Sequence, residues 1–357
     1  MRYINTKRRS AAVVAVTAAA LIVAAVAFAS TANTPAKKIG VFFVGAKNNR
    51  SFGNAVGVGA ASAAKALAPK GVKLTVIDNM NTPQQYQQQG SAFINQGYNF
   101  LLFANGGVPQ VVTSLTKQFP DVFICEVAAT ITPLPKNGCT VNLEFQYADF
   151  LAGVVAGSIT KTNHVGIIIG PPFPVLSSEA EGFLLGARWV NPNIKLTETA
   201  ISSYTDVAPA RAAALAQMGA GADVILSATD QATQGIFQAA QTKPGVWVIP
   251  QYFDSYNLAP KVVLTTVLFN INGVVDRVLK MAAAGQLTSK NYDFAYNDGV
   301  GQLAPFHANA SALTATARQR LAVTKSWMAS GKLKVPFLGN LGDAAKYNMA
   351  KLPAPPK

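Results

Sequence analysis

Aromatic and polar side chains follow several of the apolar runs in this chain, at positions where a ligand could be held. The rings could stack on a flat molecule, while carboxylates accept hydrogen bonds and amides both donate and accept them. The residues of this set are Asn49, Phe52, Asn105, Tyr204, Asp206, Asp230 and Asp254. Reversible binding of a small molecule with polar edges is the chemistry that such a set favours.

Catalysis is the competing chemistry, and the residue types argue against it. The chain has only two His, and both are predicted to be structural, because His164 opens an apolar run and His307 follows Pro305-Phe306. No Cys and His spacing indicates a zinc site, so neither a metal nor a cofactor is expected. Gly57-Val58-Gly59 lies inside a predicted helix and Ser62 stands at the third glycine position, so this is not a dinucleotide fingerprint. The Asp side chains are more simply hydrogen-bonding groups than an acid–base pair, and we expect no enzyme.

The first element that must position these side chains is the stretch from Lys38 to Leu67. An apolar run over 39–44 predicts a buried parallel strand, and the segment 52–67 predicts a helix with Ser51 as its N-cap. Phe52 then lies at the carboxyl edge of the sheet, where open α/β folds bind their ligands. Its ring is either a core plug, which is the commoner fate of Phe, or a stacking plate for a flat ligand.

The rest of the chain repeats this alternation, which predicts an α/β fold. Further strands are predicted over 72–78, 98–104, 122–127, 164–170, 194–201, 222–227, 246–251 and 262–268. Further helices are predicted over 82–96, 108–119, 147–159, 178–190, 209–218, 231–241 and 271–284. Short links between alternating strands and helices favour parallel sheets with helices on both faces. We therefore expect two doubly wound parallel-sheet lobes joined by a hinge, with their carboxyl edges facing a shared cleft.

The first 32 residues have the pattern of a secretory signal peptide. A basic start, Arg2 with Lys7-Arg8-Arg9, precedes an uncharged run over 11–29, and Ala27-Phe28-Ala29 or Ser30-Thr31-Ala32 supplies the cleavage site. An uncleaved anchor helix is the alternative, since the run is nearly long enough to span a bilayer. No Cys lies near the cleavage site, so a lipid anchor is not expected. The prediction is a soluble mature protein in the periplasm.

Size, charge and cysteine content limit the possibilities for the mature protein. About 325 residues would remain after cleavage, which is too long for one core and fits two lobes. The formal net charge of +14 would fall to +10 without the four basic residues of the leader. The remaining basic residues are scattered, so a solvated basic surface is predicted and no nucleic-acid partner. Cys125 and Cys139 could form a disulfide in an oxidising compartment, and the sequence leaves this open.

These segments together resemble the basic membrane protein family, also called PnrA-like, whose members are substrate-binding proteins of ABC importers. The resemblance covers nearly all of the predicted mature chain, in the same order. Its most specific segments are Phe150 to Gly157 and Gly186 to Pro192. The other segments that carry it are 39–45 with Ser51-Phe52, 97–100, 119–122, Tyr204-Thr205-Asp206, 221–225, Thr229-Asp230, 298–300 and 303–306.

The resemblance implies a type I periplasmic-binding fold, in which the chain crosses between the lobes near Tyr147, Pro260 and Gly301. The implied parts are a signal peptide (1–32), an N-terminal lobe (33–147 and 261–300), a C-terminal lobe (148–260 and 301–345) and a tail (346–357). It further implies a monomeric, extracytoplasmic protein that captures a purine nucleobase or nucleoside-like heterocycle. The partner that receives this ligand would be an ABC permease in the inner membrane.

In the family, a purine base lies between one aromatic residue from each lobe. Phe52 matches the first position and Tyr204 is the natural residue for the second, which favours stacking over the plug for Phe52. Asp254 matches a carboxylate that accepts from ribose hydroxyls, and Asp230 matches one that reads ring N–H or amino donors. The chain departs from the family where Asn48-Asn49 replaces an Asp, so a flat base is expected rather than a ribosylated nucleoside. A sugar-binding protein of the same fold, or a ligand sensor for a membrane receptor, is the alternative.

Overall fold

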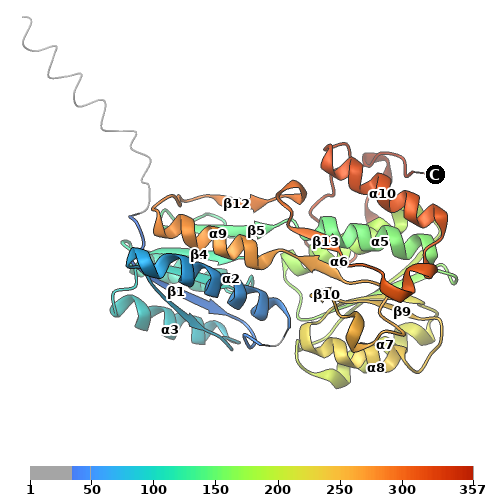
Figure 1. The fold of residues 1–357 in the computed structure, drawn as a ribbon, viewed down its shortest axis with the longest axis horizontal. Helices are drawn as coiled ribbons and strands as arrows, with labels where there is room; N and C mark the ends of the chain where they lie inside the picture. The colour runs from blue at the N-terminus through green and yellow to red at the C-terminus, as the bar shows by residue number, and fades with distance from the viewer. Residues whose placement is uncertain (1–33, 49, 357) are drawn as a thin grey trace, which may run out of the picture.

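The computed structural model describes residues 34–48 and 50–356, which form two lobes side by side (Figure 1). The predicted signal peptide and Asn49 lie outside the described residues. Among the helices that are described, none combines the length and the apolar character that crossing a bilayer requires.

The N-terminal lobe is built on a six-stranded parallel sheet with the order β12-β5-β4-β3-β1-β2. Its strands are β1 (Lys38–Phe43), β2 (Lys73–Ile77), β3 (Phe100–Ala104), β4 (Phe123–Val127), β5 (Gly138–Leu143) and β12 (Asn291–Phe294). Its helices are α2 (Phe52–Leu67), α3 (Pro83–Asn95), α4 (Pro109–Gln118) and α9 (Ile271–Ala283). Side chains of β1 serve both faces: Phe43 shares a core cluster with Val56 of α2, and Phe42 meets Phe93 of α3 with ring centroids 4.9 Å apart. Burial on both faces explains the continuous apolar run of this strand.

The C-terminal lobe is built on a four-stranded parallel sheet with the order β7-β6-β8-β9. Its strands are β6 (His164–Ile169), β7 (Lys195–Ala200), β8 (Val224–Ala228) and β9 (Trp247–Ile249). Its helices are α5 (Gln146–Ile159), α6 (Pro174–Val190), α7 (Val207–Gly219), α8 (Thr233–Ala240), α10 (Ala315–Ala329) and α11 (Asp343–Lys346). α5 and α6 approach closely because Gly153 lies against the backbone of Phe183 and Gly186 lies against the backbone of Phe150. No larger residue would fit at either crossing without moving a helix.

A small third sheet lies between the two lobes, with the order β10-β11-β13. Its strands are β10 (Gln251–Tyr252), β11 (Val267–Phe269) and β13 (Gly301–Leu303). After β11 the chain returns to the N-terminal lobe, where α9 packs on α2 and β12 pairs with β5. After β13 it returns to the C-terminal lobe, where α10 packs on α5 and α11 packs on α6. The lobe boundaries at Tyr147, Pro260 and Gly301 stay predictions.

Two details of the sequence-based prediction are wrong. The strand expected over 262–268 is shorter, because only β11 forms a ladder while Val263 makes a single bridge and Thr266 Oγ1 accepts from the backbone N–H of Ser255. Ser51 does occupy the N-cap position of α2, with extended backbone angles. However, its hydroxyl makes no capping hydrogen bond to the helix.

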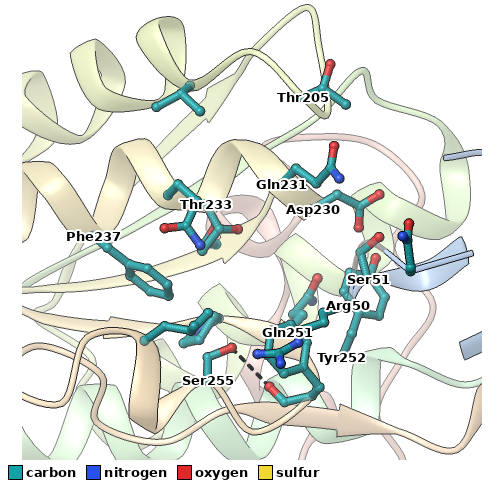
Figure 2. Close-up of a pocket in the computed structure, with 17 residues that line it drawn as sticks. Arg50, Ser51, Thr205, Asp230, Gln231, Thr233, Phe237, Gln251, Tyr252 and Ser255 are labelled. Carbon is teal, nitrogen blue, oxygen red and sulfur yellow. Dashed lines mark hydrogen bonds between the residues drawn. The ribbon is translucent and has the colours of Figure 1, made fainter. Parts of the chain in front are cut away.

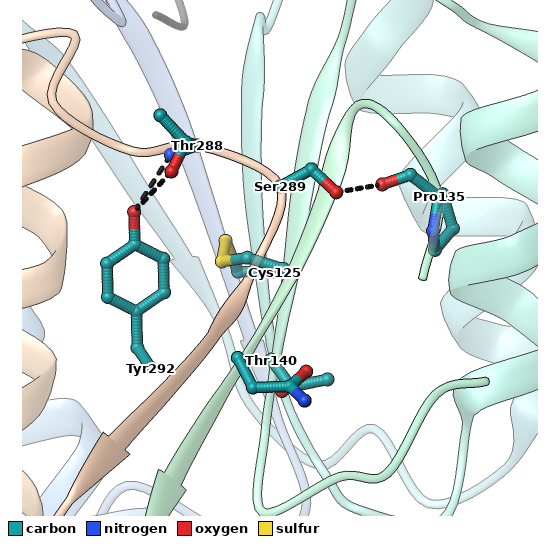
Figure 3. The surroundings of a disulfide bond; sticks show 8 residues. Cys125, Pro135, Thr140, Thr288, Ser289 and Tyr292 are labelled. Atoms are coloured by element: carbon teal, nitrogen blue, oxygen red, sulfur yellow. Dashed lines mark hydrogen bonds between the residues drawn. A yellow bond between two sulfur atoms is a disulfide. The ribbon is translucent and has the colours of Figure 1, made fainter. Parts of the chain in front are cut away.

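Cys125 and Cys139 form a disulfide, which the sequence had left open (Figure 3). The two residues are direct partners in the parallel ladder between β4 and β5, with Cα atoms 4.5 Å apart. Both side chains are fully buried. The bond therefore joins neighbouring strands inside the N-terminal lobe, and the loop that precedes β5 is closed by it.

The C-terminal segment 346–357 is packed on the C-terminal lobe up to its last described residue. The indole N–H of Trp189 donates to the carbonyl oxygen of Pro353 at 2.7 Å, and Arg188 donates to the carbonyl oxygen of Tyr347 at 3.0 Å. Both donors come from the last turn of α6. The described residues of this segment are therefore part of the lobe's surface.

Candidate functional site

A cavity of about 510 Å³ lies between the two lobes. Most of its lining residues follow the carboxyl ends of parallel strands. From the N-terminal lobe these are Val44, Gly45, Phe52, Asn105, Gly106, Gly107, Val108 and Ala128. From the other side come Pro171, Pro172, Phe173, Leu176, Glu179, Ser202, Ser203, Tyr204, Thr205, Asp230, Gln231 and Tyr252. The size and the mostly apolar walls with a few polar groups are typical of a small-molecule site.

Phe52 and Tyr204, the two rings predicted from the sequence, line this cavity from opposite lobes. The Phe52 side chain is 9% exposed, so most of its ring is packed in the core and only part of it faces the cavity. Tyr204 is held by its hydroxyl, which donates to the carbonyl oxygen of Pro171 at 2.9 Å. Gly170 lies directly against the Tyr204 ring, and a side chain at that position would displace it. Phe52 thus packs in the core and also borders the cavity, while its stacking on a flat ligand stays a prediction.

A third ring, Tyr252 of β10, was missed by the sequence analysis. Its ring meets Phe52 edge-on, with centroids 6.4 Å apart and an interplanar angle of 73°, and it meets Phe269 at 5.8 Å. Its backbone φ is +80°, which is a strained value for a bulky residue and is typical of functional sites. A two-residue strand gives no periodicity from which to find such a position. The ring that touches Phe52 therefore comes from the small third sheet between the lobes (β10-β11-β13), which we call the hinge sheet.

Asp230 follows β8 and points toward the N-terminus of α2. Figure 2 shows its carboxylate next to Ser51. Burial raises the pKa of Asp230 from 3.8 to about 7, although a hydrogen bond with the backbone of Phe52 favours the charged form. The Oδ1 atom is buried without a partner among the described residues. A ligand N–H could satisfy this oxygen.

Asn105 lies at the end of β3, where it lines the cavity as predicted from its place after an apolar run. Its Oδ1 accepts from the backbone N–H of Gly107 at 3.0 Å. Beneath it, Glu126 accepts from the backbone N–H of Val108 at 3.0 Å. Burial raises the pKa of Glu126 well above its usual range. This polar unit fixes the loop that carries Asn105.

Two of the predicted carboxylates do not line the cavity. Asp206 is exposed and caps α7, where it accepts from the backbone N–H of Ala208 at 3.1 Å. Asp254 is also exposed, and its Oδ2 lies 2.6 Å from Nε2 of His307. Both residues follow strand ends, as the sequence indicated, but the local turns direct them away from the space between the lobes. The seventh predicted residue, Asn49, lies outside the described residues.

A second cavity of about 460 Å³ adjoins the first (Figure 2). The two share Thr205, Asp230, Gln231 and Tyr252 as lining residues. The lining of the second cavity also includes the polar side chains of Ser227, Thr233, Gln234 and Ser255. Arg50 lies at its rim, with the guanidinium carbon 5.9 Å from the ring centroid of Phe253. Asp230 and Tyr252 form the wall between the two spaces.

The 510 Å³ cavity is acidic at its floor. Its described lining includes the carboxyl groups of Glu179 and Asp230 and no Lys, Arg or His. The described residues also contain no cluster of His, Cys, Asp and Glu that could hold a metal ion. The cavity therefore presents aromatic ring faces, hydrogen-bond acceptors and amides to a ligand. These groups suit an uncharged, flat molecule with N–H donors.

Comparisons with known proteins agree with this geometry. Residues 36–326 match the model of the family described as "ABC transporter substrate-binding protein PnrA-like". A purine-binding protein of Brucella abortus is 26% identical over 77% of this chain and 75% of its own length. An ABC transporter nucleoside-binding protein of Lactococcus lactis is 27% identical over 57% of this chain and 59% of its own length.

Among solved structures, a solute-binding protein of an ABC transporter system from Aeropyrum pernix has a TM-score of 0.75. It covers 87% of this chain and 95% of its own, at 15% identity, which shows a common fold. The predicted fold class, two parallel-sheet α/β lobes of the periplasmic-binding type, is thereby confirmed. The chain belongs to the PnrA-like family of ABC transporter substrate-binding proteins.

Proposed function

We propose that this protein captures a purine nucleobase, or a nucleoside-like heterocycle, in the 510 Å³ cavity and delivers it to an ABC permease. The observation that carries the proposal is the position of Phe52 and Tyr204, which border one cavity from opposite lobes. Stacking on two aromatic faces contributes roughly 1–3 kcal/mol per contact and requires no particular hydrogen-bond pattern.

Polar groups around these rings would give the site its selectivity for N–H donors. Asp230 offers a buried oxygen without a described partner, and Asn105 lies at the opposite wall. The printed names of two relatives, a purine-binding protein and a nucleoside-binding protein, support the same ligand class. Because Asp254 and Asp206 lie outside the cavity, a ribose would have few acceptors there, which favours the free base over the nucleoside.

Delivery to a permease would take place outside the cytoplasm. The family is one of substrate-binding proteins of ABC transporters, which supports a membrane permease as the partner. Export through a cleaved signal peptide, a monomeric state and the absence of turnover complete the proposal.

A thermal-shift screen of nucleobases, nucleosides and hexoses tests the ligand class. A ligand that binds the folded state raises the melting temperature by mass action. We expect purines to raise it most, and Phe52→Ala and Tyr204→Ala each to weaken binding more than tenfold without loss of the fold. Phe337→Ala is the matched control, since that ring is 52% exposed and lines neither cavity. Stabilisation by hexoses alone would refute the purine assignment, and turnover of any ligand would refute a purely binding role.

A further inference from the structure

Glu179 of α6 is a cavity residue that the sequence analysis did not single out. Its side chain is 4% exposed, yet it lines the floor of the 510 Å³ cavity. On the helix it reads as an ordinary polar position, between Ser178 and Ala180. A buried carboxyl group that borders a ligand site needs a physical explanation, because such groups are costly when charged and without a partner.

Hydrogen bonds beneath the cavity hold the Glu179 carboxyl in one orientation. The amide nitrogen of Gln251 donates to Glu179 Oε2 and to Asp149 Oδ1, at 3.0 Å in each case. An amide NH₂ has two hydrogens and no acceptor capacity, so both of its donors are used here. Glu179 Oε2 is therefore an acceptor oxygen. None of the described residues bonds to the other oxygen, Oε1.

The charges that face Glu179 all favour its neutral form. Asp149 faces it from α5, and Asp230 from the start of the turn after β8. Tyr204 and Tyr252 are the other titratable groups in electrostatic contact with it. Burial raises the pKa of Glu179 well above its usual range, and the nearby carboxyl groups of Asp149 and Asp230 raise it further, while the hydrogen bond from Gln251 lowers it. Burial has the same effect on the pKa of Asp149.

We propose that Glu179 works in this cavity as a neutral carboxylic acid that donates a hydrogen bond from Oε1 to an acceptor atom of the ligand. In the neutral acid the proton must sit on Oε1, because Oε2 already accepts from Gln251. The donor would then be available to a ligand in the cavity that Glu179 lines. This inference rests on the proposed function, which supplies the ligand class, a heterocycle. The acceptor atom would be an unprotonated ring nitrogen or a carbonyl oxygen of that heterocycle.

In this arrangement Glu179 is a hydrogen-bond donor of the site and Asp230 is an acceptor. Glu179 would read an acceptor atom of the ligand, while Asp230 would read an N–H donor, so the pair selects molecules that present both on their edges. Purines carry ring nitrogens as acceptors and amino or ring N–H groups as donors. Asp149 and Gln251 do not touch the cavity ligand in this account; they are positioning residues that keep Glu179 oriented and neutral.

Isosteric substitution separates a neutral donor from a charged acceptor. Affinities of wild type, Glu179→Gln and Glu179→Leu for adenine, hypoxanthine, adenosine and inosine would be measured by calorimetry from pH 5.5 to 9. Since the Gln amide keeps a donor, Glu179→Gln should bind within about threefold of wild type at pH 6. Its affinity should fall less between pH 6 and pH 9 than that of the wild type, which also loses the Glu179 proton; the change that remains in the variant comes from Asp230 and Asp149. Glu179→Leu should lose at least about tenfold, because it removes the donor.

Asp276 supplies the control: it is half-buried on α9, pairs with Lys280 and lines neither cavity, so Asp276→Asn should change neither affinity nor pH profile. A loss of more than tenfold in Glu179→Gln at every pH would overturn the proposal, because a charged carboxylate would then be the required form. A wild-type affinity that does not change with pH would overturn it as well.

An infrared measurement on the ligand-free protein keeps this inference separate from the ligand assignment. A carboxylic acid C=O band at pH 7 that is present in wild type and lost in Glu179→Gln supports the neutral acid. Absence of that band from the difference spectrum overturns it. If no purine or nucleoside binds the wild type, the proposed function fails, while the infrared result still decides the protonation state of Glu179.

Discussion

We predict that the carboxyl group of Asp230 links closure of the cleft to pH. This side chain comes from the C-terminal lobe and lies against the first turn of α2 in the N-terminal lobe, where the backbone of Phe52 bonds it. If the lobes open about the hinge sheet, this carboxyl becomes solvated and its pKa returns toward 3.8. In the structure described here, where this carboxyl lies between the lobes, burial raises its pKa to about 7.

The sign and the size of the effect follow from these two values. A group whose pKa is raised in the closed form favours closure most below its open-state pKa of 3.8. That contribution is lost as pH rises, until it levels off above about 7. At 1.36 kcal/mol per unit, the full difference is about 4 kcal/mol, and partial solvent access makes this an upper limit. Closure of the ligand-free protein should therefore be weaker at pH 8.5 than at pH 5.5.

Small-angle X-ray scattering of the ligand-free protein at both pH values measures this directly. The wild type should have a larger radius of gyration at pH 8.5, and Asp230→Asn should show a much smaller difference because the amide cannot ionise. Some pH dependence should persist in this variant, since Asp149 and Glu179 are also buried acids. Asp206→Asn, at an exposed helix cap, should behave as wild type. Equal pH responses in wild type and Asp230→Asn, or opening as pH falls, would refute the reasoning.

Two further predictions concern the stability of the separate lobes. Replacing Cys125 and Cys139 by Ser should lower the free energy of unfolding of the N-terminal lobe by about 3 kcal/mol, since the disulfide closes a loop with a sequence separation of 14. Chemical denaturation measures this change, and an unchanged denaturation midpoint would contradict the prediction. Gly153→Ala should destabilise the C-terminal lobe by about 1–3 kcal/mol, because the added methyl would meet the carbonyl oxygen of Phe183. Calorimetry should show a lower melting temperature for this lobe. Gly219→Ala is the control and should have little effect, because the space around the added methyl is open.

The sequence predicted those elements whose burial leaves a plain pattern. β1 and β3 are buried on both faces and read as continuous apolar runs, and the helices between them have clear boundaries such as Thr82-Pro83 before α3. By contrast, β12 reads Asn-Tyr-Asp-Phe and pairs with β5 across about 150 residues of chain. No local pattern indicates a partner at that distance, so both strands were missed. The helix α10 was missed as well, because its apolar residues are spread around the axis.

Some of the candidate binding residues could be predicted from the sequence, and others could not. Phe52, Tyr204, Asn105 and Asp230 follow long strands, so their place at a sheet edge could be predicted, and all four line the cavity. Asp206 and Asp254 follow strands too, but each accepts a hydrogen bond from a backbone N–H of its own turn, and Asp254 also bonds His307, so both point outward.

The cavity residues that were missed left no pattern to read. Tyr252 owes its position to a backbone angle of +80°, and Glu179 to helix packing that buries a residue of ordinary helical character. Such features depend on tertiary contacts, which strand and helix patterns do not encode.

Co-crystallisation with the purine that stabilises the protein most tests the central claim directly. The account predicts electron density for a planar base between Phe52 and Tyr204, within hydrogen-bond distance of Asp230. A base bound only in the adjoining cavity near Thr233 and Phe237, or outside the space between the lobes, would contradict it.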